Sequence, residues 1–386
     1  MAQKDESEAN ILSLPAEIIS LILQFFSPDE TQTFIRSINI LRKELSPILR
    51  TSLNLGCLLE LALLRLYGGR IRLTSQVKKG EDDYNSTQIT VQEFIDKFKK
   101  GDSDAQEYDY FSRFSPHTIS IEFVREVRDY KQFLDDIGLL NQVFESLRRS
   151  DVVSNCFESA GEVELYINGN AVSIESPSAI WIAIMRTLIN LTTSKFISGN
   201  FFSGKFTKVS IVSTDLGNYY VSRWSKLLSF FSNLTYLNLS DNMLKLDIDG
   251  ENFGDSFMKV DIFADDFIWP SKLKTLILDH NLISYISKNF VERLPSNSLE
   301  ELLIRSNRLI TVGVSTFEEF SLAETLPKLK KLNLRGNNGL ISIGTKLFEK
   351  DTHILEYLDV SKCNLDRFTL GFLKMTSSSQ DFKLLY

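Results

Sequence analysis

The chain has 386 residues, of which 43% are hydrophobic and 24% are charged, and its formal net charge is −7. This composition is typical of a folded protein and excludes a wholly disordered chain. Because the chain is acidic, nucleic acid and anionic membranes are poor default partners, and we expect neither. The three cysteines (Cys57, Cys156 and Cys363) lie far apart, which excludes a disulfide framework and a cysteine-based zinc site.

The first ten residues are polar and of mixed charge, unlike the basic start and apolar core of a secretory signal. The longest apolar runs, such as residues 18–26, are far shorter than the run of about 20 residues that crosses a bilayer. We therefore expect a protein of the cytoplasm or the nucleus.

Residues 11–51 have the pattern of a compact set of short helices. Pro15 suits the first turn of a helix, and apolar residues follow it at helical spacing. A capping box at Ser27 and Glu30 opens a second apolar helix around Phe34. So short a segment cannot build a core of its own, so its apolar surface must be covered by the rest of the chain or by another protein.

This segment resembles an F-box through Leu14-Pro15, the apolar helix that ends at Phe26, and the pair Pro28-Asp29. It departs from the family at residues 37–41, which contain no tryptophan. The resemblance implies a small helical module that docks on the Skp-family adaptor of a cullin-based ubiquitin ligase. The residues that would make this contact are Leu14, Pro15, Ile18, Ile22, Phe26, Phe34 and Ile35. The alternative is that the first helix packs on its own domain.

Residues 52–160 are expected to form a helical linker region and degenerate early repeats. Residues 119–123 alternate in polarity, which predicts a strand, and residues 130–147 have helical periodicity. The pattern assigns no function to this region, and an enzyme built into it would need a pocket of convergent polar groups.

The second half contains one pattern five times, close to Leu-x-x-Leu-x-Leu-x-x-Asn-x-Leu. The copies start at Leu234, Leu273, Leu299, Leu329 and Leu355, at spacings of 39, 26, 30 and 26 residues. The alternating part predicts a short strand with its apolar face inward, and the following Asn can bond backbone groups where the chain turns. That position holds Asn242, Asn281, Asn307 and Asn337, and Cys363 in the last copy. Weaker copies begin near residues 165 and 206.

These copies resemble leucine-rich repeats, which stack because one copy cannot bury its leucines alone. The resemblance implies an α/β fold, in which the F-box-like helical module at 11–51 precedes a solenoid at 161–376 and a tail at 377–386. The solenoid would carry a parallel sheet on its concave face. The outward-pointing strand residues would bind a target protein, and we name Tyr236, Asn238, Lys274, Ile277, Glu301, Leu303, Lys331, Asn333, Arg335, Tyr357 and Asp359.

The longest spacing contains an insertion, residues 245–271, that is rich in acidic and aromatic residues. It is either an elongated repeat whose aromatic side chains pack beneath it, or a protruding loop that selects a basic partner. Its carboxylate spacing does not match a calcium-binding loop.

The sequence contains no catalytic motif that we recognise. His117, His280 and His353 are isolated, and none has a second His or a Cys at metal-ligand spacing. A nucleophile elbow, a phosphate-binding loop and a dinucleotide-binding loop are all missing. We therefore expect no enzyme, no cofactor and no metal site.

Together the two resemblances imply a non-catalytic substrate receptor of an SCF-type ubiquitin ligase. The F-box-like module would bind the adaptor, and the solenoid would hold an unidentified target protein close to a ubiquitin-conjugating enzyme. The alternative is a leucine-rich-repeat scaffold or interaction protein that has no role in a ligase.

Overall fold

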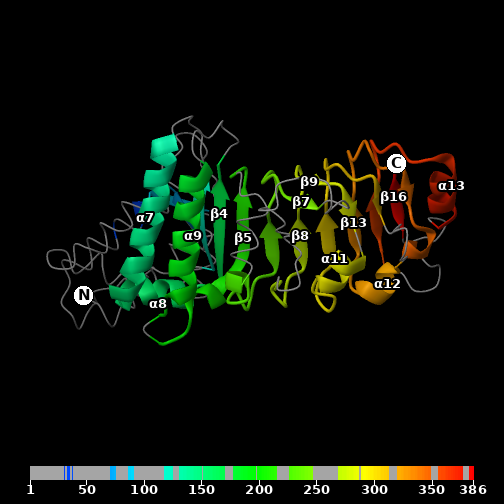
Figure 1. The fold of residues 1–386 in the computed structure, drawn as a ribbon. Helices are drawn as coiled ribbons and strands as arrows, with labels where there is room; N and C mark the ends of the chain where they lie inside the picture. The colour runs from blue at the N-terminus through cyan, green and yellow to red at the C-terminus, as the bar shows by residue number, and fades with distance from the viewer. Residues whose placement is uncertain are drawn as a thin grey trace, which may run out of the picture. The chain divides into compact units, whose positions relative to one another are not determined.

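The chain is described by a computed structural model, drawn in Figure 1. The residues it describes are 30, 33, 34, 37, 70–74, 86–90, 117–124, 130–149, 151–169, 177–196, 198–214, 226–246, 268–286, 288–312, 320–348, 355–376 and 382–386. The chain divides into two units, Met1–Ile121 with Ser150–Glu162, and Glu122–Arg149 with Val163–Tyr386. We call the second the repeat unit and describe each unit by itself.

The first unit contains a pair of parallel strands, β1 (Arg70–Thr74) and β2 (Ser86–Thr90). It also contains α8 (Asp151–Ser159). β3 (Thr118–Val124) begins in this unit and ends in the repeat unit, and it confirms the strand expected at 119–123.

The repeat unit opens with two long helices and two long strands. α7 (Tyr130–Arg149) confirms the helix expected at 130–147. β4 (Glu162–Asn168) and β5 (Phe206–Val212) form at the two weaker copies of the repeat, and they pair in parallel. Between them lie α9 (Pro177–Thr193) and the 3₁₀ helix η2 (Phe202–Lys205).

One parallel sheet continues from β4 and β5 through all five strong copies. The later strands, in spatial order, are β6 (Tyr236–Asn238), β8 (Thr275–Ile277), β11 (Glu301–Leu303), β13 (Lys331–Asn333), β15 (Tyr357–Asp359) and β16 (Lys383–Leu385). Each strand from β6 to β15 starts two residues after the first leucine of its copy, as the repeat pattern predicts. β16 lies in the segment expected to be a tail, where it pairs with β15.

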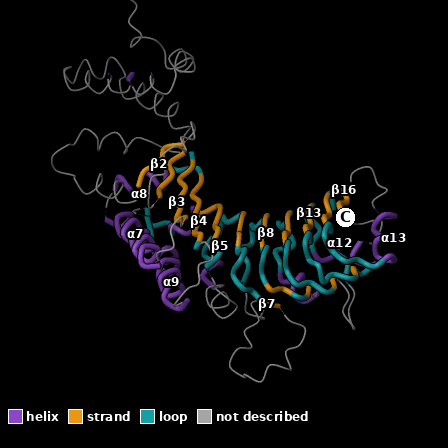
Figure 2. Tube along the Cα trace, turned by 90° about the horizontal axis from the view of Figure 1, so that it is seen from above, coloured by secondary structure: helices purple, strands orange, loops and turns teal. Residues whose placement is uncertain are grey.

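The side of the repeat unit away from the main strands is built from short pieces. They are β7 (Lys245–Leu246), β9 (Leu282–Ile283), β10 (Tyr285–Ile286), α11 (Lys288–Arg293), β12 (Thr311–Val312), α12 (Leu322–Thr325), β14 (Ser342–Ile343), the 3₁₀ helix η3 (Thr345–Phe348) and α13 (Arg367–Thr376). β10, β12 and β14 form a second parallel sheet. Figure 2 shows the main strands along one side of the unit, with α9 and α12 on the opposite side.

The core of the repeat unit lies between these two sides. The central leucine of every strand from β6 to β15 is buried, and so is the leucine that opens each copy. Ile286 and Phe290 are also buried and cover the same core from the back, as expected. Stacking of the copies therefore removes from water the apolar residues that one copy alone would leave exposed.

Candidate functional site

The side of the main sheet that no described helix covers is the candidate site, and we call it the strand face. Parallel pairing places equivalent residues of the repeats side by side, so the face consists of rows that cross the strands. The first row is Tyr236, Thr275, Glu301, Lys331 and Tyr357, and all five side chains are half-buried. The second row, at the carboxyl ends of the strands, is Asn238, Ile277, Leu303, Asn333 and Asp359. Every residue that we predicted for target binding lies in these rows or directly beside them.

Opposite charges lie next to one another on the strand face and in the positions just before its strands, and they form ion pairs. Lys331 Nζ lies 3.3 Å from Glu301 Oε2 in the first row. In the positions just before the strands, Lys274 Nζ lies 3.2 Å from Glu300 Oε1, and Lys330 Nζ lies 3.8 Å from Glu356 Oε1. Exposed pairs of this kind contribute little to stability, but they define which charges remain for a partner.

The polar members of the second row fold back onto their own chain. Asn333 Oδ1 accepts a hydrogen bond from the Arg335 backbone N–H at 3.0 Å, and Asp359 Oδ1 accepts one from the Ser361 backbone N–H at 2.9 Å. The pattern predicted that Leu303, Asn333 and Asp359 point outward, but all three are buried. Asn333 and Asp359 are hydrogen-bonded to their own chain. They shape the turn after each strand and offer a partner little surface.

A ladder of buried amides lies beneath the strand face and holds the turns in place. The Asn281 Oδ1 accepts from the backbone N–H groups of Asn242 and Leu244, each at 3.0 Å. Its Nδ2 donates to the carbonyl oxygens of Leu239 and Leu278, each at 3.0 Å. Asn242, Asn307 and Asn337 repeat this arrangement in their own copies. The role predicted for the Asn position is confirmed, because buried backbone groups need such partners.

Cys363 occupies the last step of the ladder and fills only part of the Asn role. Its Sγ donates to the Leu334 carbonyl oxygen at 3.3 Å, but a thiol has no amide oxygen with which to accept from the preceding turn. Burial raises the pKa of this thiol. Cys156, in the first unit, is fully buried, and burial raises the pKa of its thiol to about 12. Neither thiol has the lowered pKa of a nucleophile.

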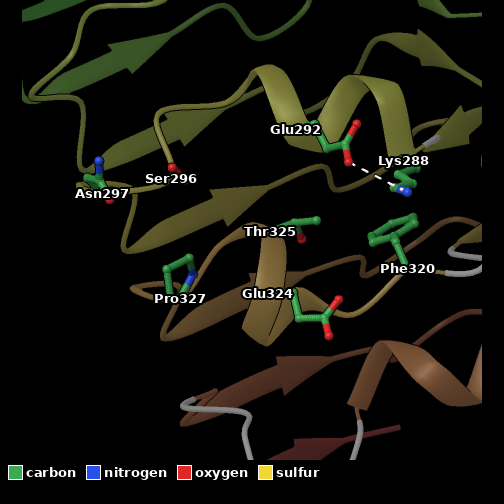
Figure 3. A pocket seen from close by; sticks show the side chains of 8 residues that line it. All are labelled: Lys288, Glu292, Ser296, Asn297, Phe320, Glu324, Thr325 and Pro327. Atoms are coloured by element: carbon green, nitrogen blue, oxygen red, sulfur yellow. Dashed lines mark ion pairs between the residues drawn. The ribbon is translucent and has the colours of Figure 1, made fainter.

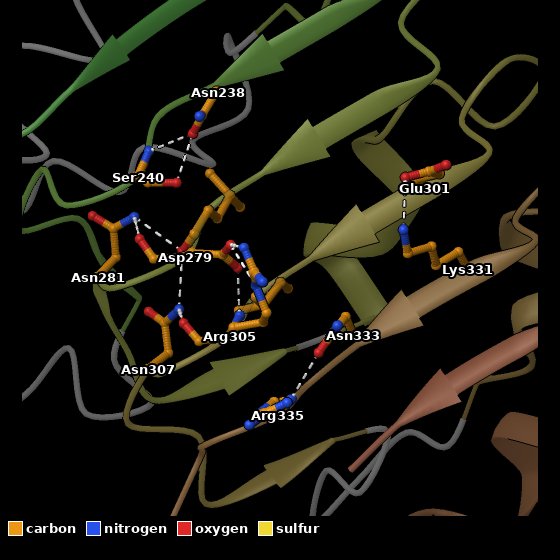
Figure 4. Close-up of polar contacts among 12 residues, drawn as sticks. Asn238, Ser240, Asp279, Asn281, Glu301, Arg305, Asn307, Lys331, Asn333 and Arg335 are labelled. Atoms are coloured by element: carbon orange, nitrogen blue, oxygen red, sulfur yellow. Dashed lines mark hydrogen bonds and ion pairs between the residues drawn. The ribbon is translucent and has the colours of Figure 1, made fainter. Parts of the chain in front are cut away.

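An ion pair that we did not predict stands at the carboxyl end of β8 and β11. Asp279 is buried, and its Oδ2 lies 2.6 Å from Arg305 Nη2 and 2.7 Å from Arg305 Nε. Its Oδ1 accepts from the Arg305 backbone N–H at 2.7 Å (Figure 4). Asp279 also raises the pKa of the Arg305 guanidinium, mainly through its hydrogen bond with that side chain. The sequence spacing could have indicated this pair, because Asp279 and Arg305 are 26 positions apart, which is one repeat length.

The last strands of the sheet form a corner that is rich in positive charge, and we call Lys331, Arg335, Tyr357 and Lys383 the basic corner. The Nζ atoms of Lys331 and Lys383 each lie 5.8 Å from the centre of the Tyr357 ring. The Tyr357 hydroxyl donates to Asp359 Oδ2 at 3.3 Å. Burial, followed by the neighbouring Asp359, raises the pKa of Tyr357, so the hydroxyl remains a neutral donor.

A hollow of about 470 Å³ opens on the opposite side of the unit, between α11 and α12 (Figure 3). Its charged lining consists of Lys288, Glu292 and Glu324, and Lys288 Nζ lies 3.7 Å from Glu292 Oε1. No nucleophile paired with a base lines it, so it has no catalytic arrangement.

Two further searches cover the described residues alone. Within them no group of three or more His, Cys, Asp or Glu side chains stands together as metal ligands would. In the same ranges, no helix has the length and apolar character that spanning a bilayer requires.

The residues predicted to bind an adaptor fall largely outside the described ranges. Leu14, Pro15, Ile18, Ile22, Phe26 and Ile35 are not described, and Phe34 is helical and half-buried. Most of the insertion at 245–271 is also outside, but Trp269 near its end is buried, as expected for an aromatic side chain that packs beneath the repeat.

No protein-family model matches the chain, and no curated protein matches it. Similar solved structures include an internalin (InlF) of Listeria monocytogenes, at 12% identity and a TM-score of 0.32 over 79% of this chain and 84% of that one. Another belongs to an octameric complex of Latrophilin 3, Unc5D and FLRT2, at 12% identity and a TM-score of 0.28 over 69% of this chain and 75% of that one. Scores this low carry no argument, so the leucine-rich-repeat architecture rests on the strand register and the amide ladder.

Proposed function

We propose that this chain is a non-catalytic recognition subunit that binds a protein partner through the strand face. The observation that carries the proposal is the uncovered first row, from Tyr236 to Tyr357, on turns held by buried amides. A rigid support lowers the conformational entropy that binding costs, and mixed charges beside the apolar Ile277 suit a protein better than a polyanion.

In its specific form, the proposal makes the chain the target-binding subunit of an SCF-type ubiquitin ligase. The support is the F-box-like sequence at 11–51, whose apolar residues from Leu14 to Ile35 would dock on the Skp-family adaptor. The chain would contribute proximity between the target and the conjugating enzyme, and no reacting group. Without the adaptor contact, the proposal reduces to an interaction scaffold.

The strand-face proposal is tested with proteins crosslinked to the full-length chain in cells. Ile277→Glu adds a charge to the middle of the strand face and should remove the specific partners. Ile341→Glu is the matched control, since Ile341 is an exposed isoleucine that does not belong to the strand face. If both variants keep the same partners, the strand face is not the binding surface.

The ligase proposal is tested separately by co-purification with the adaptor. The double variant Pro15→Ala/Ile18→Glu should lose the adaptor and keep the strand-face partners. Ubiquitylation of a captured partner in a reconstituted reaction should then require the unmodified segment at 11–51. An adaptor that is retained by the double variant would remove the F-box assignment and leave the scaffold.

A further inference from the structure

The carboxylates of the strand face already have ion-pair or hydrogen-bond partners, whereas two of its cations form no ion pair with any described residue. Asp279, Glu300, Glu301 and Glu356 each pair with a Lys or an Arg of a neighbouring strand or turn. Asp359 accepts hydrogen bonds from Ser361 and Tyr357. By contrast, neither Arg335 nor Lys383 forms an ion pair with any described residue. The face therefore has surplus positive charge at the basic corner, although the whole chain has a net charge of −7.

The backbone that carries Arg335 is held in place before any partner arrives. The buried Asn333 accepts from the Arg335 N–H, and the following Gly336 adopts a positive φ of 75° that fixes the turn. After the neighbouring strand β11, Arg305 is paired with Asp279 through Nε and Nη2 (Figure 4). Both guanidinium groups lie close enough to Tyr357 to lower its pKa against the effect of burial. An anion that reaches this corner would therefore meet the Arg335 guanidinium, whereas the Tyr357 hydroxyl already donates its hydrogen to Asp359.

The apolar part of the face lies at a set distance from Arg335. Ile277 is on β8, and Arg335 follows β13, two strands away in the order β8-β11-β13. With strands about 4.8 Å apart, the two positions are separated by about 10 Å across the sheet. Arg335 also lies two residues beyond Asn333, which is in register with Ile277, so the whole separation is about 12 Å. An extended peptide advances about 3.3 Å per residue, so about three to four residues cover this distance.

Building on the proposed function, we propose that the partner presents an extended acidic peptide segment across β8, β11 and β13. A Glu or Asp carboxylate of this segment accepts paired hydrogen bonds from Arg335. An apolar side chain about three to four residues away along the peptide lies on the half-buried Ile277. Tyr357, held between Lys331 and Lys383, forms the wall beside the carboxylate.

The probe for this proposal is a library of random twelve-residue peptides displayed on phage and selected on the full-length chain. Enriched peptides should carry Asp or Glu about three to four residues from an apolar residue. For a synthetic copy of an enriched peptide, Arg335→Gln should weaken binding by about tenfold or more, as expected when a charged hydrogen bond is lost. Replacing the peptide's acidic residue by its amide should cost a similar factor, with little further loss on Arg335→Gln.

The matched control is Arg308→Gln, since Arg308 is an exposed arginine of the same repeat unit that lies outside the strand face. It should leave affinity unchanged. Peptides that bind Arg335→Gln as well as the unmodified chain, but lose binding to Ile277→Glu, would overturn the acidic-peptide proposal and support the strand face. Failure to enrich any peptide sensitive to either variant would overturn the acidic-peptide proposal, while the cellular crosslinking experiment would still decide the proposed function.

Discussion

The two ends of the repeat unit cover the back of one continuous sheet in different ways. At β4 and β5 the cover consists of helices, and α7 and α9 are joined by a hydrogen bond of 2.9 Å between Asn190 Nδ2 and Asn141 Oδ1. From β6 to β15 it consists of turns, short strands and the short helices α11, α12 and η3. Helices satisfy their own backbone groups, whereas turns bring unpaired N–H and C=O groups into the interior.

The interiors differ accordingly. The helical end contains a chain of aromatic rings, in which Phe202 lies 5.6 Å from Phe144, 5.2 Å from Phe196 and 5.2 Å from Phe206 between ring centres. The later copies contain the amide ladder instead. Dispersion and hydrophobic burial thus hold the first end, whereas hydrogen bonds to the turns are indispensable in the second.

The turns of the later copies share a second property. The residue directly before each ladder position has a positive φ: Asp241, His280, Ser306, Gly336 and Lys362. Apart from Gly336, all of these are residues for which the left-handed region costs energy. The ladder bonds therefore also stabilise a backbone conformation that most of these side chains disfavour.

The largest effect should come from the aromatic end. Phe202→Ala removes the ring that contacts three others, and we expect the free energy of unfolding to fall by about 4 kcal/mol. Urea denaturation of the full chain measures it. Phe230→Ala, at an exposed phenylalanine, is the control and should change little. A loss below about 1 kcal/mol for Phe202→Ala would mean that the rings do not hold this end together.

The second largest loss in the free energy of unfolding is expected from a substitution in the amide ladder. Asn281→Ala leaves the buried N–H groups of Asn242 and Leu244 without acceptors, which should cost about 3 kcal/mol. Hydrogen exchange should show the loss at β6 and β8 before it reaches α7. Asn338→Ala, at an exposed asparagine one residue beyond the ladder, serves as the matched control. Equal effects of the two substitutions would contradict the role of the ladder.

Replacing glycine by alanine should change the stability in opposite directions at the two ends of the repeat unit. Gly336→Ala forces a side chain into a positive φ and places its Cβ 3.0 Å from Ser306 Oγ, so we expect a loss of about 1–2 kcal/mol. Gly138→Ala, on the exposed face of α7 with no atom near the new Cβ, should raise stability by about 0.5–1 kcal/mol. Thermal unfolding of the two variants measures this difference. Midpoints that shift in the same direction would contradict the expected contrast between the two ends.

The smallest effect is expected at Cys363, the last position of the amide ladder, where a thiol replaces the Asn side chain. Cys363→Asn supplies the amide oxygen that the thiol lacks, and it should raise the free energy of unfolding by about 1 kcal/mol. Cys363→Ser, which donates but has no amide, should not reproduce the gain. Chemical denaturation of the unmodified chain and the two variants measures the free energy of unfolding. A lower value for Cys363→Asn would show that the last turn does not accept the hydrogen bonds of the ladder.

The sequence alone determined the positions of the repeat strands, their apolar face and the role of the Asn residues. It could do so because each property depends on spacing within one copy: alternation sets the buried face, and the Asn follows the strand at a constant offset. The residues that we propose bind a target could be named for the same reason. Even Asp279 and Arg305 could have been paired, since one repeat length separates them.

Only the tertiary structure decided which of the named residues remain available to a partner. It buried Asn333 and Asp359 in their own turns, paired the carboxylates of the strand face, and left Arg335 without an ion pair among the described residues. It also added β16 to the sheet and placed left-handed residues before the ladder. These outcomes depend on distances between side chains of neighbouring copies, which are set when the copies stack. The repeat pattern gives the spacing within one copy but not the distances to the adjacent copies.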